Sequence, residues 1–92
     1  MGVRMKRIVL LTSESCNVCK NAIKDLIDVT IDNPISLSII DVDATNKDEI
    51  IKKYGFNAIV TPTLCLMEDD KVKECIVGYT GDYKERIRRL IK

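Results

Sequence analysis

Two cysteines three positions apart, in the stretch "SESCNVCK" (residues 13–20), have the types and spacing that most directly suggest chemistry in this sequence. They follow the apolar run "RIVLLT" and precede an amphipathic segment. Cys16 and Cys19 could form a redox couple, supply half of a metal site, or make a structural disulfide. The element that holds them and the other cysteines of the chain must decide between these three hypotheses.

The redox hypothesis needs an accessible thiolate and a second thiol close enough to displace it from a mixed disulfide. A Cys-x-x-Cys sequence on the first turn of a helix supplies both, because unpaired N–H groups and the helix dipole stabilise a negative sulfur. Lowering a thiol pKa from about 8.5 to near 7 raises the thiolate share at neutral pH from a few per cent to about half. We therefore expect Cys16, with Lys20 one turn on, to be the nucleophile and the more buried Cys19 to be the resolving thiol.

The metal and structural hypotheses are weaker on ligand count and on loop size. Four cysteines could form an all-thiolate zinc site, but the chain has one Cys-x-x-Cys, and Cys65 and Cys75 lie ten residues apart. Mixed Cys/His zinc sites are excluded because the chain has no histidine. A disulfide that closes so small a loop as Cys16–Cys19 removes little entropy from the unfolded chain. The sequence therefore favours redox chemistry, with no metal and no bound cofactor.

The second pair of cysteines predicts a different role. Cys65 in "TLCLM" and Cys75 in "ECIV" lie in predicted strands, where an unpaired cysteine is usually a small buried hydrophobe. A three-residue turn at 69–71 would set them opposite each other, so a cross-strand disulfide is possible. A reducing compartment argues against it. We expect both residues to be dispensable for turnover.

The first half of the chain predicts a βαβ unit around the reactive pair. Residues 5–12, "MKRIVLLT", are β-branched and continuously apolar at their centre, which indicates a central strand buried on both faces and paired in parallel. Residues 16–31 predict a helix from apolar positions at three- and four-residue spacing, with Ser13 or Ser15 near its cap. Residues 35–42, "ISLSIIDV", alternate apolar and polar and predict the next strand.

The second half predicts a short helix, a hairpin and a final helix. The short helix is closed by Gly55. The segments "TPTLCLM" (61–67) and "KVKECIV" (71–77) are separated by acidic turn residues and predict the hairpin. Apolar positions on one face mark the last helix: Tyr83, Ile87, Leu90 and Ile91. The expected order is β-α-β-α-β-β-α, an α/β class.

Length and charge limit the possible functions. Ninety-two residues, 46% of them hydrophobic, predict a single domain over residues 1–92 with a modest core. Fifteen basic and 14 acidic residues give a net charge of +1, which offers no electrostatic case for nucleic acid or an anionic membrane as obligate partner. The apolar run Ile8–Leu11 is shorter than a signal-peptide core, and no segment is long enough to span a membrane. We expect a cytoplasmic protein.

Nearly the whole chain resembles the thioredoxin superfamily. The similarity lies in "CNVC" after a strand, "IDVDATNKDEIIKKYGF", "TPTLCLM" with its acidic turn, and "VGYTGD" before the last helix. The resemblance implies a thioredoxin fold, a four-stranded mixed sheet with three flanking helices. It also implies that Pro62 is in the cis form beside the two sulfurs, and that the backbone of Thr61 pairs with the substrate chain.

The chain also departs from typical thioredoxins. It lacks an extra strand and helix ahead of the first strand, so its size is closer to a glutaredoxin or to short archaeal thioredoxin-like proteins. Ser15 stands where the family has tryptophan, Asn17-Val18 where it has glycine-proline, and Leu10 where it has a buried aspartate. The segment "GYTGD" resembles the glycine-rich glutathione-binding turn of glutaredoxins.

The resemblance and the residues together predict a protein disulfide oxidoreductase. Disulfide-containing proteins would be its substrates, and a reductase or glutathione its electron donor, in electron transport and cell redox homeostasis. We expect thioredoxin reductase to serve better than glutathione, because "TPT" and the hairpin after it look more like thioredoxin. The alternatives are a glutathione-dependent glutaredoxin, and a metal-binding or non-catalytic adaptor on the same fold.

Overall fold

The computed structural model describes residues 5–56 and 58–91. Its elements follow the predicted order β-α-β-α-β-β-α, which is confirmed. They are β1 (Lys6–Thr12), α1 (Cys19–Asp32), β2 (Ser36–Asp41), α2 (Lys47–Tyr54), β3 (Thr63–Glu68), β4 (Lys71–Val77) and α3 (Tyr83–Ile91).

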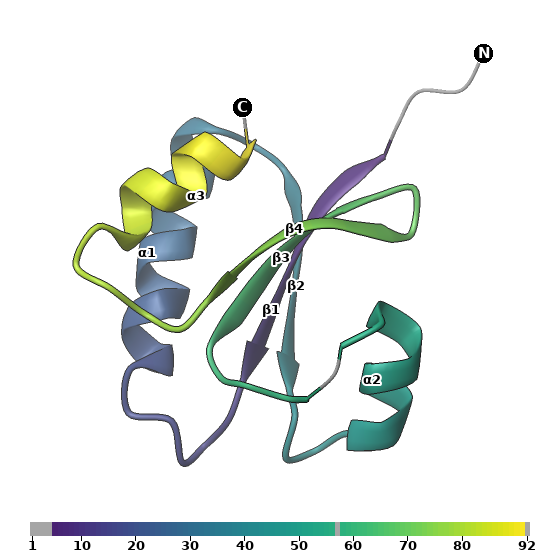
Figure 1. Cartoon of the computed structure of the whole chain (residues 1–92). Helices are drawn as coiled ribbons and strands as arrows, with labels where there is room; N and C mark the ends of the chain where they lie inside the picture. Colours follow the sequence, from purple (N-terminus) through teal and green to yellow (C-terminus); the bar gives the residue numbers. More distant parts are fainter. Residues whose placement is uncertain (1–4, 57, 92) are drawn as a thin grey trace.

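The four strands form one mixed sheet in the order β2-β1-β3-β4. β1 pairs in parallel with β2 and antiparallel with β3, and β3 pairs antiparallel with β4. Helices α1 and α3 lie on one face of the sheet and α2 lies on the other (Figure 1). The predicted four-stranded sheet with three flanking helices is confirmed, and so is the central position of β1.

Each face of the sheet carries its own apolar cluster. Ile8 and Leu10 of β1 point to the side of α1 and α3, where they pack with Leu26 and Ile87. Their neighbours Val9 and Leu11 point to the side of α2, where they pack with apolar residues that include Ile50, Tyr54 and Met67. Both faces of β1 are therefore buried, which explains why the run is continuously apolar.

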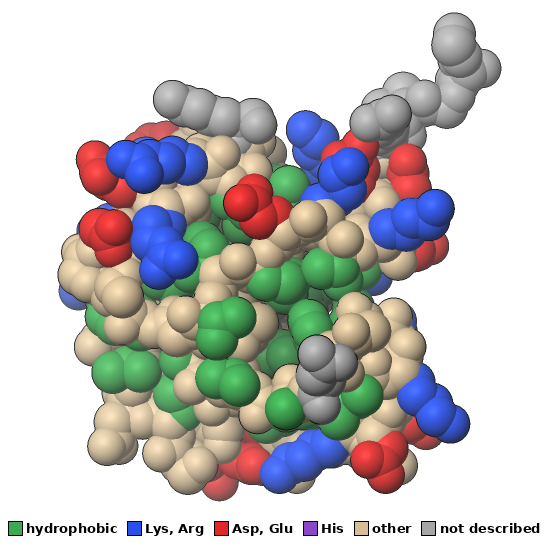
Figure 2. All heavy atoms as spheres, viewed as in Figure 1, with side chains coloured by type: hydrophobic (Ala, Val, Ile, Leu, Met, Phe, Trp, Pro, Cys, Tyr) green, Lys and Arg blue, Asp and Glu red, His purple; other side chains and the backbone are tan. Residues whose placement is uncertain are grey.

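Several large apolar side chains remain at the surface. Figure 2 shows hydrophobic side chains as a band across the middle of one face, with most of the charged side chains above and below it. Those of the described residues that are more than a third exposed are Met5, Val18, Ile27, Ile31, Ile39, Val60 and Val77. Ile39 is 43% exposed because it lies on β2, which is an edge strand of the sheet.

Helix α2 has well-defined ends. The Asn46 side chain accepts the N–H of Asp48 at 2.9 Å and that of Glu49 at 3.4 Å, which satisfies two of the unpaired donors of the first turn. Gly55 closes the helix in the left-handed region at φ 73°, as predicted. These caps fix where the chain enters and leaves α2.

Helix α1 begins later than predicted. The expected helix over residues 16–31 was to be capped by Ser13 or Ser15, but α1 starts at Cys19, and Val18 at the cap position makes no side-chain hydrogen bond. The two serine hydroxyls bond each other at 3.0 Å instead. Cys16 therefore lies in the turn just ahead of α1 and not on its first turn.

The hairpin between β3 and β4 also differs from the prediction. Its turn has two residues, Asp69 and Asp70, with φ of 52° and 68°, and not three. Two positive φ values give a turn whose twist suits the flanking strands. The register then skips Lys73, because Leu66 lies opposite Glu74 but Met67 lies opposite Val72.

This bulge determines the pairing of the second cysteine pair. With the extra residue in β4, Cys65 lies directly opposite Cys75, and the two form a disulfide with a Cα–Cα distance of 4.1 Å. The expectation of unpaired buried thiols is thus wrong for this structure. The predicted opposition of the two residues is correct, although a bulge and not a three-residue turn produces it.

Candidate active site

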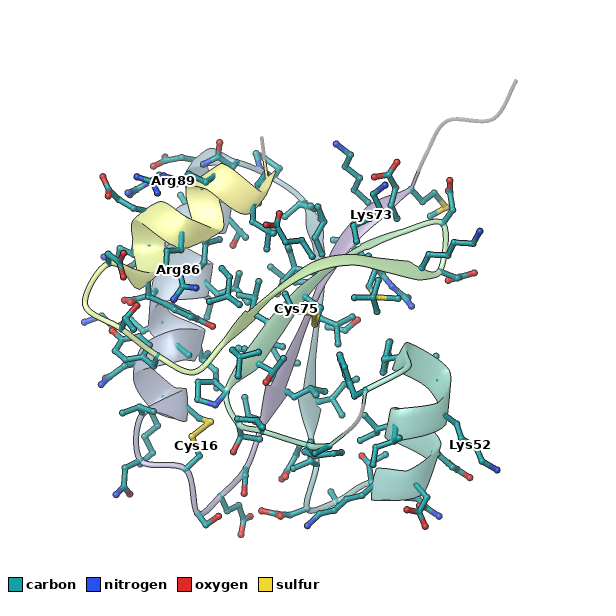
Figure 3. All side chains as sticks on the ribbon, in the orientation of Figure 1. Cys16, Lys52, Lys73, Cys75, Arg86 and Arg89 are labelled. Carbon is teal, nitrogen blue, oxygen red and sulfur yellow. A yellow bond between two sulfur atoms is a disulfide. The ribbon has the colours of Figure 1, made fainter. Side chains whose placement is uncertain are left out.

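The Cys16–Cys19 pair lies between the end of β1 and the start of α1. The two residues form a disulfide with a Cα–Cα distance of 5.4 Å, at the N-terminal end of α1 (Figure 3). Cys16 is partly exposed, whereas Cys19 is 3% exposed and belongs to the buried face of the helix. Of the two cysteines, Cys16 is the more exposed.

Two backbone turns hold this loop ahead of the helix. The Cys16 N–H donates to the Ser13 carbonyl at 3.1 Å, and the Cys19 N–H donates to the Cys16 carbonyl at 3.3 Å. The next N–H groups of α1 have no intrahelical acceptor, so the positive end of the helix dipole lies beside the pair. A thiolate formed at Cys16 would be stabilised by this dipole even though the residue precedes the helix.

Asp43, in the loop after β2, anchors the reactive loop, which is residues 13–18 between β1 and α1. Its Oδ2 accepts the Ser13 hydroxyl at 2.7 Å and the Glu14 N–H at 3.0 Å. The hydrogen bond from Ser13, followed by that from Glu14, holds the pKa of Asp43 below its ordinary value. Sequence reasoning missed this contact. Its signal was an acid just after β2 and a serine just after β1, since parallel neighbours end at the same edge of the sheet.

Thr61 and Pro62 lie at this same edge. The Thr61–Pro62 peptide bond is cis, as the resemblance implied. Leu11 of β1 lies opposite Thr63 of β3, so the residues just before β3 meet those just after β1. The Pro62 carbonyl accepts the N–H of Gly78 at 2.8 Å, which ties this segment to the end of β4.

A polar cavity of about 570 Å³ joins the reactive loop to Thr61. The structure thus brings one predicted substrate-binding residue to the loop that carries Cys16. Pairing of Thr61 with a substrate chain stays a prediction. The residues that line the cavity come from four segments and include acidic and basic side chains. They are Ser13, Ser15, Val42, Asp43, Lys47, Asp48, Ile51, Ala58, Ile59 and Thr61.

A second long-range hydrogen bond, which the sequence analysis did not predict, joins α1 to the turn before α3. The Tyr79 hydroxyl donates to Asp25 Oδ2 at 2.8 Å, and this hydrogen bond raises the pKa of Tyr79. Tyr79 belongs to the "GYTGD" segment that resembles a glutathione-binding turn, and the bond holds that segment against α1. Leu10, at the place of the thioredoxin aspartate, is fully buried among apolar side chains.

A metal site is the main alternative to a redox pair for these cysteines. Across residues 5–56 and 58–91, no three cysteine or acidic side chains lie close enough together to hold a metal ion. The four cysteines are instead divided between two pairs.

Within the same described ranges, no helix has the length and apolar character needed to cross a membrane.

The fold and the close cysteine pair define a thioredoxin-fold protein with a redox role. Residues 7–90 match the model of the glutaredoxin-like domain (DUF836), so the chain belongs to this family. No curated protein matched the sequence.

Solved thioredoxins share the architecture. Thioredoxin O2 from Arabidopsis thaliana in the oxidized state is 20% identical with a TM-score of 0.76, covering 96% of this chain and 76% of that one. Desulfothioredoxin from Desulfovibrio vulgaris Hildenborough in its reduced form is 26% identical with a TM-score of 0.72, covering 94% and 78%. A thioredoxin from Fasciola hepatica is 20% identical with a TM-score of 0.75, covering 95% and 78%.

Proposed function

We propose that this protein reduces disulfides of other proteins by dithiol exchange through Cys16 and Cys19. The observation that carries the proposal is the asymmetry of the pair: a partly exposed Cys16 is bonded to a nearly buried Cys19 at the positive end of α1. The glutaredoxin-like family and the thioredoxin fold support a redox role for such a pair.

The proposed reaction has two exchange steps. The Cys16 thiolate attacks one sulfur of a substrate disulfide, and the other substrate sulfur leaves as a thiolate. The Cys19 thiolate then attacks the Cys16 sulfur and expels the first substrate sulfur. The substrate gains two electrons and two protons, and the Cys16–Cys19 disulfide that results must be reduced by a donor before the next cycle.

The proton on Cys19 needs an acceptor in the second step. Thioredoxins place a buried aspartate there, but Leu10 supplies only hydrocarbon. The substrate thiolate released in the first step is the base that the reaction itself creates. We infer that it removes the Cys19 proton, so that the two steps are coupled through the leaving group.

The site also offers a place for the substrate chain. Thr61 lines the polar cavity beside the reactive loop, and its backbone would pair with the residues that flank the substrate disulfide. Val18 and Val60 are 39% and 47% exposed, and they add apolar surface just before α1 and beside Thr61. A peptide of mixed polarity fits this combination.

Trapping variants test the order of the steps. All are made with Cys65→Ala and Cys75→Ala, so that no other thiol reacts. Cys19→Ser should accumulate a covalent adduct with a disulfide-bonded protein such as insulin through Cys16, because attack proceeds but resolution cannot. Cys16→Ser should form no adduct. Intact mass and peptide mapping identify the trapped residue.

Alkylation gives an independent readout of the same assignment. Iodoacetamide at about pH 6 to 7 should label Cys16 of the reduced protein before Cys19, because only a lowered pKa leaves much thiolate there. Adducts or first labelling at Cys19 would reverse the nucleophile assignment. If neither thiol reacted and both bound zinc, as measured by metal content, the protein would be a metal-binding adaptor and not a reductase.

The electron donor divides two versions of the proposal. Thioredoxin reductase is the donor we favour, but membership in a glutaredoxin-like family supports glutathione as a second candidate. Coupled turnover of NADPH with insulin, comparing thioredoxin reductase with glutathione plus its reductase, separates them. Efficient turnover with glutathione and none with thioredoxin reductase would make the protein a glutaredoxin.

A further inference from the structure

The Cys65–Cys75 disulfide has no part in the function proposed above. It joins the middle of β3 to the middle of β4, and its two cysteines differ in exposure. Cys65 is 1% exposed, whereas Cys75 is partly exposed. This repeats the pattern of the first pair, in which one cysteine is partly exposed and the other is buried.

Cys75 opens into an apolar pocket on the α2 side of the sheet. The pocket has a volume of about 300 Å³, and no charged side chain is among the described residues that line it: Leu11, Phe56, Ala58, Val60, Thr63, Cys75 and Val77. Val60 and Val77 at its rim are 47% and 58% exposed. An apolar molecule that enters this pocket therefore meets Cys75 without contacting a charged side chain among the described residues that line it.

The two disulfides cannot exchange directly within one chain. Cys65 lies opposite Val9, and β1 continues for three residues to Thr12 before the loop that carries Cys16. Three residues of strand span about 10 Å. In Figure 3, Cys16 lies beside the N-terminal end of α1, whereas Cys75 lies on β4 in the middle of the sheet. Reduction of the second pair therefore needs an external thiol.

We propose that Cys65–Cys75 is a second thiol-disulfide exchange site, which apolar thiols attack at Cys75 through this pocket. The thiolate of an external dithiol bonds to the Cys75 sulfur, and the Cys65 sulfur leaves and takes up a proton. The second thiol of the reductant then attacks its own bound sulfur and releases Cys75. The pair gains two electrons and two protons, and the dithiol becomes a disulfide.

Burial of Cys65 shapes this reaction. A thiolate in that position is poorly solvated and lies next to the mixed disulfide, so it re-attacks Cys75 and expels a monothiol. A monothiol should therefore give little stable adduct with the intact pair, whereas a dithiol should complete the reduction. With Cys65 removed, an adduct at Cys75 should persist.

The test uses Cys16→Ala, Cys19→Ala protein, so its outcome is independent of the proposed function. A third substitution, Cys65→Ala or Cys75→Ala, leaves one thiol in each of two matched variants. Both are treated, folded, with dibenzyl disulfide and with the disulfide of 2-mercaptoethanesulfonate, and adducts are followed by intact mass. We expect Cys75 to react at least about tenfold faster than Cys65, and faster with the benzyl than with the sulfonate reagent.

Two further measurements keep the result decisive. Val77→Glu, at an exposed position of the rim, should reduce the preference of Cys75 for the benzyl reagent without unfolding the protein, as checked by circular dichroism. Dithiothreitol should reduce the pair in the folded Cys16→Ala, Cys19→Ala protein. Equal rates at Cys65 and Cys75, no preference for the benzyl reagent, or reduction only in denaturant would overturn the proposal and leave the disulfide as a structural crosslink.

Discussion

At the scale of single residues, the reactive loop is held by side chains outside the Cys-x-x-Cys sequence. Asp43 accepts hydrogen bonds from the Ser13 hydroxyl and the Glu14 N–H, and so joins the loop before Cys16 to the loop after β2. A charged acceptor makes stronger hydrogen bonds than a neutral one. The position of Cys16 therefore depends on an acid that comes from the loop after β2.

We expect Asp43→Ala to loosen this loop. The Glu14 amide should exchange its hydrogen faster at neutral pH, and the melting temperature should fall. Because the folded pKa of Asp43 is lowered, its contribution to stability is present above the unfolded value of about 3.9 and is lost as the pH falls through the folded value. The difference in melting temperature between wild type and Asp43→Ala should thus shrink in acid.

Asp43→Asn is the matched control for this charge effect. The asparagine side chain keeps an oxygen that can accept the Ser13 hydrogen bond, but it does not titrate. The stability of this variant should therefore lack the loss in acid that protonation of Asp43 causes in wild type. A difference between wild type and Asp43→Ala that stayed constant from pH 7 to about pH 2 would show that the carboxylate charge does not stabilise the loop.

At the scale of elements, the β3–β4 hairpin shows how a turn controls a distant contact. Asp69 and Asp70 both have positive φ, which suits a two-residue turn, and the bulge that follows brings Cys65 opposite Cys75. The turn sets the register of the first strand pairs, and the bulge shifts the register of the remaining pairs by one residue. Without the bulge, Cys65 would lie opposite Glu74 and the disulfide could not form.

Substitutions at Asp70, the second residue of the turn, test whether its positive φ affects stability. Asp70→Gly should leave the free energy of unfolding unchanged or raise it by up to about 0.5 kcal/mol, since glycine adopts positive φ freely. Asp70→Val should lower it by about 1 to 2 kcal/mol. Both variants lose the exposed 3.7 Å ion pair with Arg7, which contributes little. Urea unfolding measures the difference, and equal destabilisation by both variants would contradict the backbone explanation.

At the scale of the whole molecule, the sheet is stabilised by two separate apolar clusters. The larger one, between the sheet and the α1 and α3 helices, includes Tyr83, which is fully buried. The Tyr83 hydroxyl has no hydrogen-bond partner within the part of the chain that the structure describes. Burial is the main cause of the raised pKa of this phenol.

Tyr83→Phe should therefore change stability in alkali. Tyr83 stays protonated in the folded protein, whereas in the unfolded chain it ionises near pH 10. Its contribution to the free energy of unfolding is therefore complete below about pH 10 and is lost as the pH rises through the folded pKa. At pH 7 the variant should be as stable as wild type or more stable by up to about 1 kcal/mol.

Urea midpoints of both proteins from pH 7 to about pH 11 measure this effect. Other tyrosines and the lysines titrate in both proteins, so only the difference between the two curves reports on Tyr83. Parallel curves, or a large loss of stability in Tyr83→Phe at pH 7, would show that the hydroxyl has a polar partner in solution.

The sequence by itself determined the order of the elements, the buried central strand, the Gly55 cap and the close Cys16–Cys19 pair. These are local patterns: a continuous apolar run, a glycine after a short helix, two cysteines three residues apart. The resemblance of "TPTLCLM" and its neighbours to thioredoxins added the fold and the cis form of the Thr61–Pro62 bond, both confirmed.

Only the tertiary structure decided which distant residues meet. Asp43 lies 30 residues from Ser13, and Asp25 lies 54 residues from Tyr79. Neither contact has a local signature, because each depends on how strands and helices are placed beside one another. The same holds for the late start of α1, where Ser13 bonds to Asp43 and does not cap the helix, and for the bulge that pairs Cys65 with Cys75. Local sequence sets which elements form, and packing between them sets the partners of each side chain.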